Sequence, residues 1–212
     1  MSVEAIIKAR GIESVVHFTT NRGSLGVLAS RALKSRKRLH SDDELKHIFQ
    51  PNASNRNKDK DWLDYANLSI TRINTAFFGA SGSWHKEKDF FWCILEFCSE
   101  VMMHDGVWFT TTNNIYTGVK RNDTPEALEA MFGPSITQWS GRLVERPQNY
   151  PVNIPTCSQA EVLYPGELST KYLKKIYVRA DSEIDEIAAQ IAAVDHPAVE
   201  IEVKPELFVE IK

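Results

Sequence analysis

A glutamine and a glutamate stand two residues apart in the last third of the chain, where a polar stretch turns into an apolar run. They are Gln159 and Glu161, within residues 154–164. In an extended strand, residues two positions apart point to the same face, so we expect these side chains to project side by side. A carboxylate held in this way acts as a general base or stabilises a developing positive charge. A solvated strand edge is the alternative interpretation, and the spacing alone does not decide between the two.

A second polar cluster follows an apolar run near the N-terminus. Residues 13–18 predict a strand, which leads into His17, Thr19 and Asn21. Residues 23–33 then predict a helix that is entered through glycine and followed by basic residues. Hydrogen-bonding side chains at the end of a strand are well placed to hold a ligand. The alternative for His17 is a core histidine whose ring nitrogens bond the backbone.

These two parts of the chain resemble the DarT family, toxins that ADP-ribosylate bases of single-stranded DNA with NAD. The resemblance extends from about His17 to about Val178 and rests on the His-Phe-Thr strand end, Leu25 and Leu28 of the following helix, and the late Gln-Ala-Glu-Val-Leu run. It implies an α+β fold with an ADP-ribosyltransferase-like split β-sheet core and helices packed around it. It also implies single-stranded DNA and a macrodomain-type antitoxin as partners.

The resemblance implies a role for each polar cluster. Glu161 becomes the catalytic glutamate, which stabilises positive charge on a ribose as nicotinamide leaves, and Gln159 orients the nucleobase. NAD is the co-substrate, and the residues expected to bind it are His17, Phe18, Thr19, Asn21, Leu25, Tyr65 and Ser69.

The middle of the chain departs from the thymidine-modifying branch of that family. The branch carries a Val-Pro-Phe-Tyr-Phe type strand followed by Pro-Met, whereas residues 64–74 here read Asp-Tyr-Ala-Asn-Leu-Ser-Ile-Thr-Arg-Ile-Asn. We therefore expect guanine as the modified base, with thymine as the alternative. Arg72 is the candidate catalytic cation, facing the pyrophosphate or the base; its alternative is a solvated strand residue.

A long irregular stretch, residues 133–158, precedes Glu161. Structureless segments of this length are often binding loops, and transferases of this class carry a substrate-recognition loop at this point. Trp139, Arg142 and Arg146 lie in it, and aromatic residues beside arginines stack bases and neutralise phosphates. An ordinary surface loop is the alternative. We expect these three residues to bind the substrate.

Composition limits the class of protein. The 212 residues suit a single domain over 1–212, and the net charge of −3 excludes a bulk polyanion binder. A basic segment at 31–40 is either a solvated loop or a footprint for phosphates. The three cysteines have no zinc or disulfide spacing, so we expect no metal, and with no signal peptide or membrane span we expect a cytoplasmic protein.

Hydrophobic periodicity and turn residues predict the elements that position these residues. We expect helices at 3–9, 23–33, 42–49, 125–132 and 181–194, strands at 13–18, 65–70, 90–97, 107–112, 161–164, 173–179 and 198–203, and a loop at 80–89.

Two other functions fit the same residues. A Gln-x-Glu pair also occurs in transferases that modify protein, so a transferase acting on RNA or protein is one alternative. A catalytically silent nucleic-acid-binding module, using the basic segment and the aromatic residues, is the other. The chain has no Gly-x-Gly-x-x-Gly or Walker pattern, which argues against a dinucleotide-binding fold.

Overall fold

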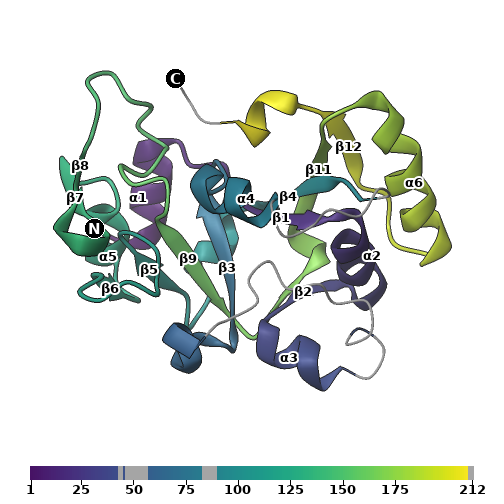
Figure 1. Cartoon of the computed structure of the whole chain (residues 1–212), viewed down its shortest axis with the longest axis horizontal. Coiled ribbons are helices and arrows are strands. Elements are labelled where there is room, and N and C mark those ends of the chain that lie inside the picture. The colour runs from purple at the N-terminus through teal and green to yellow at the C-terminus, as the bar shows by residue number, and fades with distance from the viewer. Residues whose placement is uncertain (43–44, 46–56, 83–89, 210–212) are drawn as a thin grey trace.

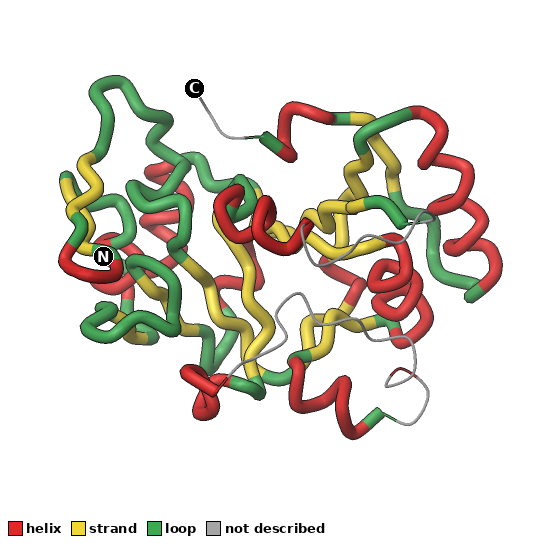
Figure 2. The backbone as a smooth tube through the Cα atoms, viewed as in Figure 1, coloured by secondary structure: helices red, strands yellow, loops and turns green. Residues whose placement is uncertain are grey.

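The computed structural model describes residues 1–42, 45, 57–82 and 90–209. Its core is an eight-stranded sheet in the order β12-β11-β4-β1-β3-β9-β5-β6 (Figures 1 and 2). The strands are β1 (Ser14–Thr20), β3 (Tyr65–Ile70), β4 (Trp92–Cys98), β5 (Trp108–Thr110), β6 (Arg121–Asn122), β9 (Glu161–Pro165), β11 (Leu173–Val178) and β12 (Glu200–Val203).

The sheet is split between β1 and β3. Strand β1 pairs with β4 along its whole length, from Ser14 to Thr20. It pairs with β3 only through Val15 and Val16, after which β3 continues beside β9. The strands therefore divide into two halves joined by one short contact, as expected from the family resemblance. Figure 1 shows β3 and β9 side by side near the centre, with β4 and β11 to their right.

Helices cover both halves of the sheet. On one half, α2 (Asn21–Ser30) packs against α6 (Ile184–Ala193); on the other, α1 (Val3–Arg10) packs against α5 (Pro125–Ala130). Two shorter helices are α3 (Arg36–Ser41) and α4 (Thr75–Gly82). The 3₁₀ helices are η2 (Asn57–Trp62), η3 (Ser99–Met103), η4 (Trp139–Gly141), η5 (Thr170–Tyr172), η6 (Asp181–Glu183) and η7 (Pro205–Phe208).

Local chemistry moves two predicted helix boundaries. The helix expected at 23–33 begins at Asn21, because the Thr20 hydroxyl caps it by accepting from the Gly23 N–H at 3.1 Å. It ends at Ser30, because Arg31 takes a left-handed conformation with φ 54°. The chain then forms β2 (Ala32–Lys34), which pairs with β10 (Glu167–Ser169).

Two regular elements lie where we expected irregular chain. Helix α4 reaches Gly82, into the expected 80–89 loop, and it begins where the Asn74 side chain accepts from the Phe77 N–H at 3.0 Å. The stretch 133–158 contains the hairpin β7 (Ser135–Thr137) and β8 (Leu143–Glu145). Most of the helix expected at 42–49 lies outside the described residues. The helix expected at 181–194 opens with the 3₁₀ turn η6 before α6.

The packing on each face of the sheet follows from β-branched and aromatic strand sequences. Strand β4 is buried on both faces apart from its last residue, which its nearly unbroken apolar sequence predicts. One face carries the main core, including Leu28, Leu95 and Phe97; the other carries an aromatic cluster that includes Phe18 and Phe78.

We expect Leu95→Ala to lower the free energy of unfolding by about 2–5 kcal/mol, since this side chain is fully buried at the centre of β4. Urea denaturation followed by circular dichroism measures the change. Val152→Ala is the matched control: its side chain is exposed, so the free energy of unfolding should change by less than about 0.5 kcal/mol. Equal losses in the two variants would contradict this assignment of the core.

Candidate active site

The Glu161 carboxylate is held at the split by donors from two neighbouring segments. The Asn67 side-chain amide donates to its Oε1 at 2.9 Å, and the Asn114 backbone N–H donates to its Oε2 at 2.7 Å. Sheet register explains this arrangement, because β9 runs between β3 and β5, with Leu163 opposite Asn67 and Glu161 opposite Thr110. Each carboxylate oxygen thus has a fixed donor, which sets the direction in which the charge faces.

Asn67 belongs to an alternating face of β3. Tyr65, Asn67 and Ser69 are partly exposed, whereas the intervening Ala66 and Leu68 are in the core. The two residues that we expected at the NAD site therefore share a face with Asn67, the residue between them. Sequence reasoning missed Asn67, although the period-two alternation of the strand was the signal that would have found it.

His17 connects the two halves of the sheet just beyond their last paired residues. Its Nδ1 lies 2.9 Å from the Asn67 carbonyl oxygen, which can only accept, so Nδ1 carries the proton. Burial lowers the pKa of His17, and the hydrogen bond to Asn67 offsets part of that effect. The ring is therefore neutral at pH 7, and Nε2 is an acceptor. Asn67 links this ring to Glu161, so the two residues singled out in the sequence do meet in one site.

The other residues expected at the NAD site differ in what their side chains do. Phe18 packs in the aromatic cluster, with ring centroids 5.3 Å from Phe78 and 5.6 Å from Trp92, so only its backbone is left for a ligand. Thr19 lies against the first turn of α2, where a Cβ on Gly23 would stand 2.0 Å from its Oγ1. That close approach requires glycine at position 23.

Asn21 and Leu25 come from the first half of α2. Asn21 is buried, and its amide donates to Glu186 Oε1 of α6 at 2.6 Å. Leu25 is half-buried. This hydrogen bond from Asn21 to α6 therefore fixes the start of α2. No sequence pattern indicated the contact between the two helices.

Gln159 does not share a strand face with Glu161, so that expectation was wrong. Strand β9 begins at Glu161, and Gln159 lies in the turn before it. The Tyr116 hydroxyl donates to Gln159 Oε1 at 2.6 Å. Because the turn precedes the strand, the orientation of Gln159 comes from Tyr116 and not from strand alternation.

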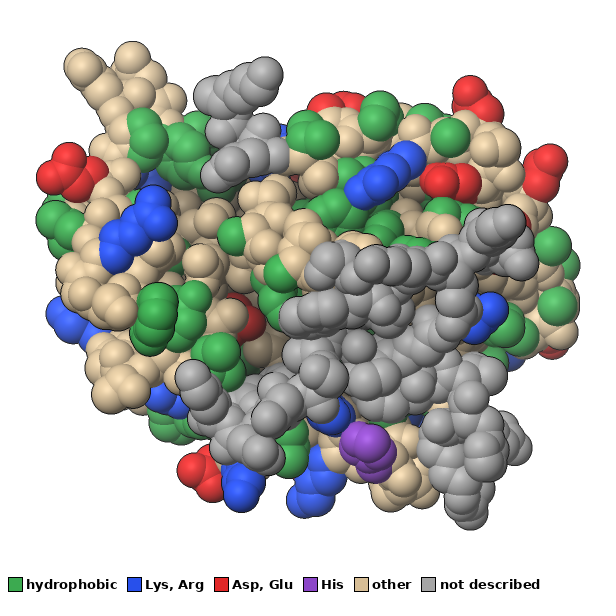
Figure 3. Space-filling view, in the orientation of Figure 1, with side chains coloured by type: hydrophobic (Ala, Val, Ile, Leu, Met, Phe, Trp, Pro, Cys, Tyr) green, Lys and Arg blue, Asp and Glu red, His purple; other side chains and the backbone are tan. Residues whose placement is uncertain are grey.

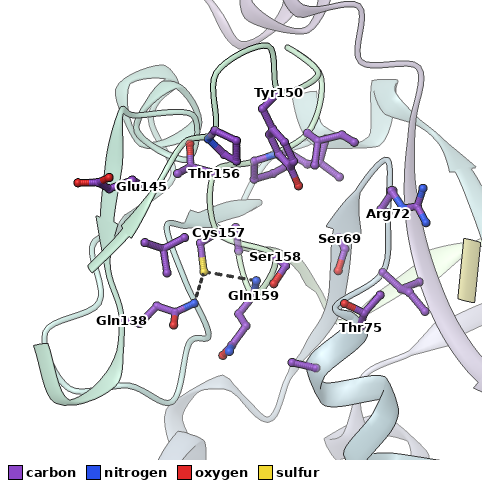
Figure 4. Close-up of a pocket in the computed structure, with 18 of the residues that line it drawn as sticks. Ser69, Arg72, Thr75, Gln138, Glu145, Tyr150, Thr156, Cys157, Ser158 and Gln159 are labelled. Carbon is purple, nitrogen blue, oxygen red and sulfur yellow. Dashed lines mark hydrogen bonds between the residues drawn. The ribbon is translucent and has the colours of Figure 1, made fainter. Parts of the chain in front are cut away.

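A cavity of about 330 Å³ adjoins Gln159, between the β3–α4 connection and residues 138–160 (Figure 4). Its lining is mixed: hydroxyl and amide groups stand beside the Tyr150 ring and several apolar side chains. Among the expected site residues, the cavity wall includes Ser69, Arg72, Arg142 and Gln159. The size and the polar lining suit a nucleobase or a similar ring.

Two of the expected cations bond to this chain's own backbone. The Arg72 guanidinium donates to the carbonyl oxygens of Glu206 and Val209, at 2.5 and 3.0 Å. Arg146 donates to the carbonyl oxygens of Pro151 and Ile154 and so braces the loop before Glu161. Their contacts give both residues a structural role, and their roles toward a substrate stay predictions.

The tip of the β7–β8 hairpin carries the other two substrate candidates. Trp139 is 67% exposed, and Arg142 is exposed three residues later. The exposed Trp139 ring is accessible to a ligand, and its role in binding the substrate stays a prediction. Figure 2 shows that the chain between β8 and β9 is mainly loop.

Carboxylates pair with some of the basic residues of the segment at 31–40. Lys34 pairs with Asp42 at 2.7 Å, and Arg38 pairs with Asp64 and Glu167 at 3.3 and 3.6 Å. Figure 3 shows Lys, Arg and His side chains along the lower edge of this face, over α3. These contacts give Lys34 and Arg38 a structural role, and a phosphate footprint at the other basic residues stays a prediction.

Within the described ranges, no cluster of His, Cys, Asp and Glu could hold a metal ion. In the same part of the chain, no helix is long and apolar enough to cross a membrane. Cys93, Cys98 and Cys157 are free thiols, and burial raises the pKa of Cys93.

The neutral state of His17 predicts a loss of stability in acid. In the unfolded chain the ring titrates near its ordinary pKa of 6.5, whereas in the folded protein this pKa is lower. The contribution of His17 to the free energy of unfolding is therefore fully present above pH 6.5. It is lost as the pH falls from that value through the lower pKa of the folded state. Thermal denaturation at about pH 7.5 and about pH 5.5 measures this loss.

The matched variant is His17→Asn, whose side-chain amide can replace the Nδ1 donor without titrating. We expect a smaller drop in Tm for the variant than for the unaltered chain. Equal drops would show that His17 is not the group responsible.

Comparison with known proteins identifies the family. The family model described as "ssDNA thymidine ADP-ribosyltransferase, DarT" matches residues 16–209. A search of curated proteins finds no match.

Solved structures of DarT proteins share the fold at low sequence identity. Thermus sp. 2.9 DarT in complex with carba-NAD+ is 13% identical with a TM-score of 0.64, over 93% of this chain and 98% of that one. The same protein in complex with ADP-ribosylated ssDNA is 11% identical with a TM-score of 0.63, over 94% and 97%. Thermosipho africanus DarTG in complex with ADP-ribose is 13% identical with a TM-score of 0.56, over 92% of this chain and 51% of that one. The predicted split-sheet transferase fold is confirmed, and the chain belongs to the DarT family.

Proposed function

We propose that this chain is an NAD-dependent ADP-ribosyltransferase that acts, as a single domain, on a base of single-stranded DNA. The observation that carries the proposal is the Glu161 carboxylate, fixed by Asn67 and Asn114 at the split of the sheet beside a neutral His17. Membership of the DarT family supports it, as do the NAD+ and ADP-ribosylated ssDNA complexes of the Thermus protein.

The split fits NAD because its hydrogen-bonding groups complement a ribose. His17 Nε2 is an acceptor once Nδ1 donates to Asn67, so it suits a ribose hydroxyl. The backbone at Phe18, together with Thr19 and Asn21, borders the same strand end. Leu25 of α2, and Tyr65 and Ser69 of β3, complete the lining that we assign to the co-substrate.

Glu161 stabilises the positive charge that develops on the ribose as the bond to nicotinamide breaks. NAD supplies the ADP-ribosyl group and nicotinamide as the leaving group. A nitrogen of the DNA base forms the new bond to the same ribose carbon. Glu161 then stands ready to accept the proton that this nitrogen loses, so that one carboxylate serves both bond changes.

We assign the DNA to the side of the site that carries Gln159 and the adjoining cavity. Gln159 orients the target base, and the exposed Trp139 offers a ring on which a neighbouring base stacks. Arg142 and Arg72 border the cavity and supply positive charge, and Arg146 holds the loop in shape. The proposed catalytic role of Arg72 requires its guanidinium to exchange the Glu206 and Val209 carbonyls for the substrate.

Guanine is the base that we favour, with thymine as the alternative. The support is the sequence of β3, which has Asn67 where it meets Glu161 and lacks the Val-Pro-Phe-Tyr-Phe pattern of the thymidine-modifying branch. The description of the matching family model names thymidine and supports the alternative.

We also propose an antitoxin of macrodomain type as the partner of this chain. The support is the match to Thermosipho africanus DarTG in complex with ADP-ribose, of which this chain covers 51%.

Labelled NAD and a set of single-stranded oligonucleotides, each lacking one of the four bases, test this function. We expect transfer of label to every oligonucleotide except the one that lacks guanine. Glu161→Gln is the matched control, because it keeps the shape of the side chain without the charge, and it should abolish transfer.

Other outcomes separate the alternatives. Loss of transfer only without thymine would move the target base to thymine. NAD consumption without transfer to DNA would point to RNA or protein, and no NAD turnover at all would contradict the transferase proposal.

Removing one donor to the carboxylate should slow the reaction without weakening the fold. We expect Asn67→Ala to lower kcat for nicotinamide release by about 10- to 100-fold, since a hydrogen bond to a charged group is worth about 1.5–3 kcal/mol. Steady-state nicotinamide release measures it, with Asn122→Ala, an exposed residue of β6, as the control. An unchanged kcat in folded Asn67→Ala would contradict the role of this donor in the reaction.

A further inference from the structure

The segment 111–121, which comprises the β5–β6 connection and Arg121, the first residue of β6, contacts both residues of the Gln159–Glu161 pair. The Asn114 N–H donates to Glu161 Oε2 at 2.7 Å, and the Tyr116 hydroxyl donates to Gln159 Oε1 at 2.6 Å. Two residues of one short segment therefore reach the charged group and the amide of the site. None of our sequence reasoning assigned a role to either Tyr116 or Arg121.

Internal hydrogen bonds give this segment a defined shape. The Thr111 N–H donates to the Lys120 carbonyl at 3.1 Å, and the Val119 N–H donates to the Tyr116 carbonyl at 3.3 Å. At its start, Thr110 pairs with Arg121 across the β5–β6 ladder. The segment is thus a folded turn anchored to β5, the strand that pairs with β9. A change in the conformation of this turn would therefore move the donor that holds Glu161.

Arg121 braces the part of the segment that holds the carboxylate. Its Nη1 donates to Asn114 Oδ1 at 2.8 Å, and its guanidinium lies over the Trp62 ring, 5.2 Å from the centroid. Trp62 in turn packs against Trp108 of β5 and Tyr65 of β3. The side chain of Asn114 is therefore bonded to a cation that stacks on Trp62, a ring that packs against two strands of the same half-sheet.

Tyr116 decides which end of the Gln159 amide faces a ligand. Burial raises the pKa of Tyr116, so its hydroxyl stays protonated and donates at neutral pH. The Gln159 carbonyl is occupied by that donor, so the two N–H groups of the amide are left for the base. A fixed donor matches the oxo group that guanine carries at O6 and thymine at O4. It opposes the amino group that adenine and cytosine carry at the corresponding ring position, N6 and N4.

We propose that the segment 111–121 is a positioning element with two separable tasks, in which Tyr116 orients the Gln159 amide so that the site accepts oxo bases and rejects amino bases, and Arg121, acting through Asn114, orients the Glu161 carboxylate. This inference rests on the proposed function, since it concerns how a base of DNA is selected at that site. Tyr116 and Arg121 are positioning residues, and neither needs to touch NAD or the base.

Two variants test the two tasks on the full chain. Mixed-sequence single-stranded DNA is incubated with NAD and digested to nucleosides, and mass spectrometry gives the share of ADP-ribose on each base. Tyr116→Phe removes the donor and lets the amide turn over. We expect the share on deoxyadenosine and deoxycytidine to rise about tenfold or more, with nicotinamide release little changed.

Arg121→Met should give the opposite pattern. We expect kcat for nicotinamide release to fall about tenfold with the KM for NAD and the base distribution unchanged, because only the carboxylate loses its brace. Ile115→Ala, an exposed position in the same segment, is the matched control and should change neither quantity. Thermal denaturation of each variant verifies that it is folded.

Distinct results would overturn each part. A folded, active Tyr116→Phe variant with the base distribution of the unaltered chain would overturn the role of Tyr116. An Arg121→Met variant with unchanged kcat, or with its loss entirely in KM, would overturn the role of Arg121. No DNA modification by the unaltered chain would instead overturn the proposed function, and the inference about base selection with it.

Discussion

The short pairing between β1 and β3 is the constraint on which the rest of the site depends. Strand β1 is paired with β4 along its whole length but with β3 only at Val15 and Val16. Beyond these residues the strand edges diverge, and their polar groups face each other across a gap that backbone pairing does not close. A longer contact would leave a continuous sheet with no room for a ligand between His17 and Glu161. The split therefore gives up sheet hydrogen bonds in exchange for a site.

Asn67 makes that split chemically coherent. Its backbone carbonyl accepts a hydrogen bond from the Nδ1–H of His17, and its side-chain amide donates one to Glu161. One residue therefore fixes both the tautomer of the histidine and the direction of the carboxylate. The groups left over are a neutral imidazole nitrogen and a carboxylate, which both accept hydrogen bonds. These two acceptors suit ribose hydroxyls and a developing positive charge. Neither can donate a hydrogen bond to the phosphates of NAD. The pyrophosphate must therefore find its donors elsewhere on the chain.

Sequence reasoning located the expected residues that lie on regular strands and failed where contacts depend on turns. The strand ends singled out His17 and Glu161, and the family resemblance added Tyr65 and Ser69; the structure brings His17 and Glu161 together through Asn67. Gln159 was expected on the same strand face as Glu161, although the predicted strand, like β9, begins only at Glu161, and Gln159 lies in the turn before it. The polar turn after the strand expected at 107–112 indicated that Asn113 or Asn114 lies at the rim of the site, whereas no sequence signal pointed to Tyr116. The importance of Asn114 and Tyr116 comes from tertiary proximity of segments more than 40 positions apart.

The position of Gln159 in a turn bears on how one fold serves two kinds of base. A glutamine on a strand would be oriented by the sheet, whereas a turn residue takes its orientation from a neighbour, here Tyr116. A fixed donor does not distinguish guanine from thymine, because both present an oxo group. The choice between them must then come from size, as a purine needs more room than a pyrimidine. The cavity of about 330 Å³ beside Gln159 provides that room, and its wall is shared by β3 and the loop before Glu161. Under the proposed function, base choice is thus expected to reside in the shape of this wall, and the hydrogen bond proposed from Gln159 to the base sets only the class of base.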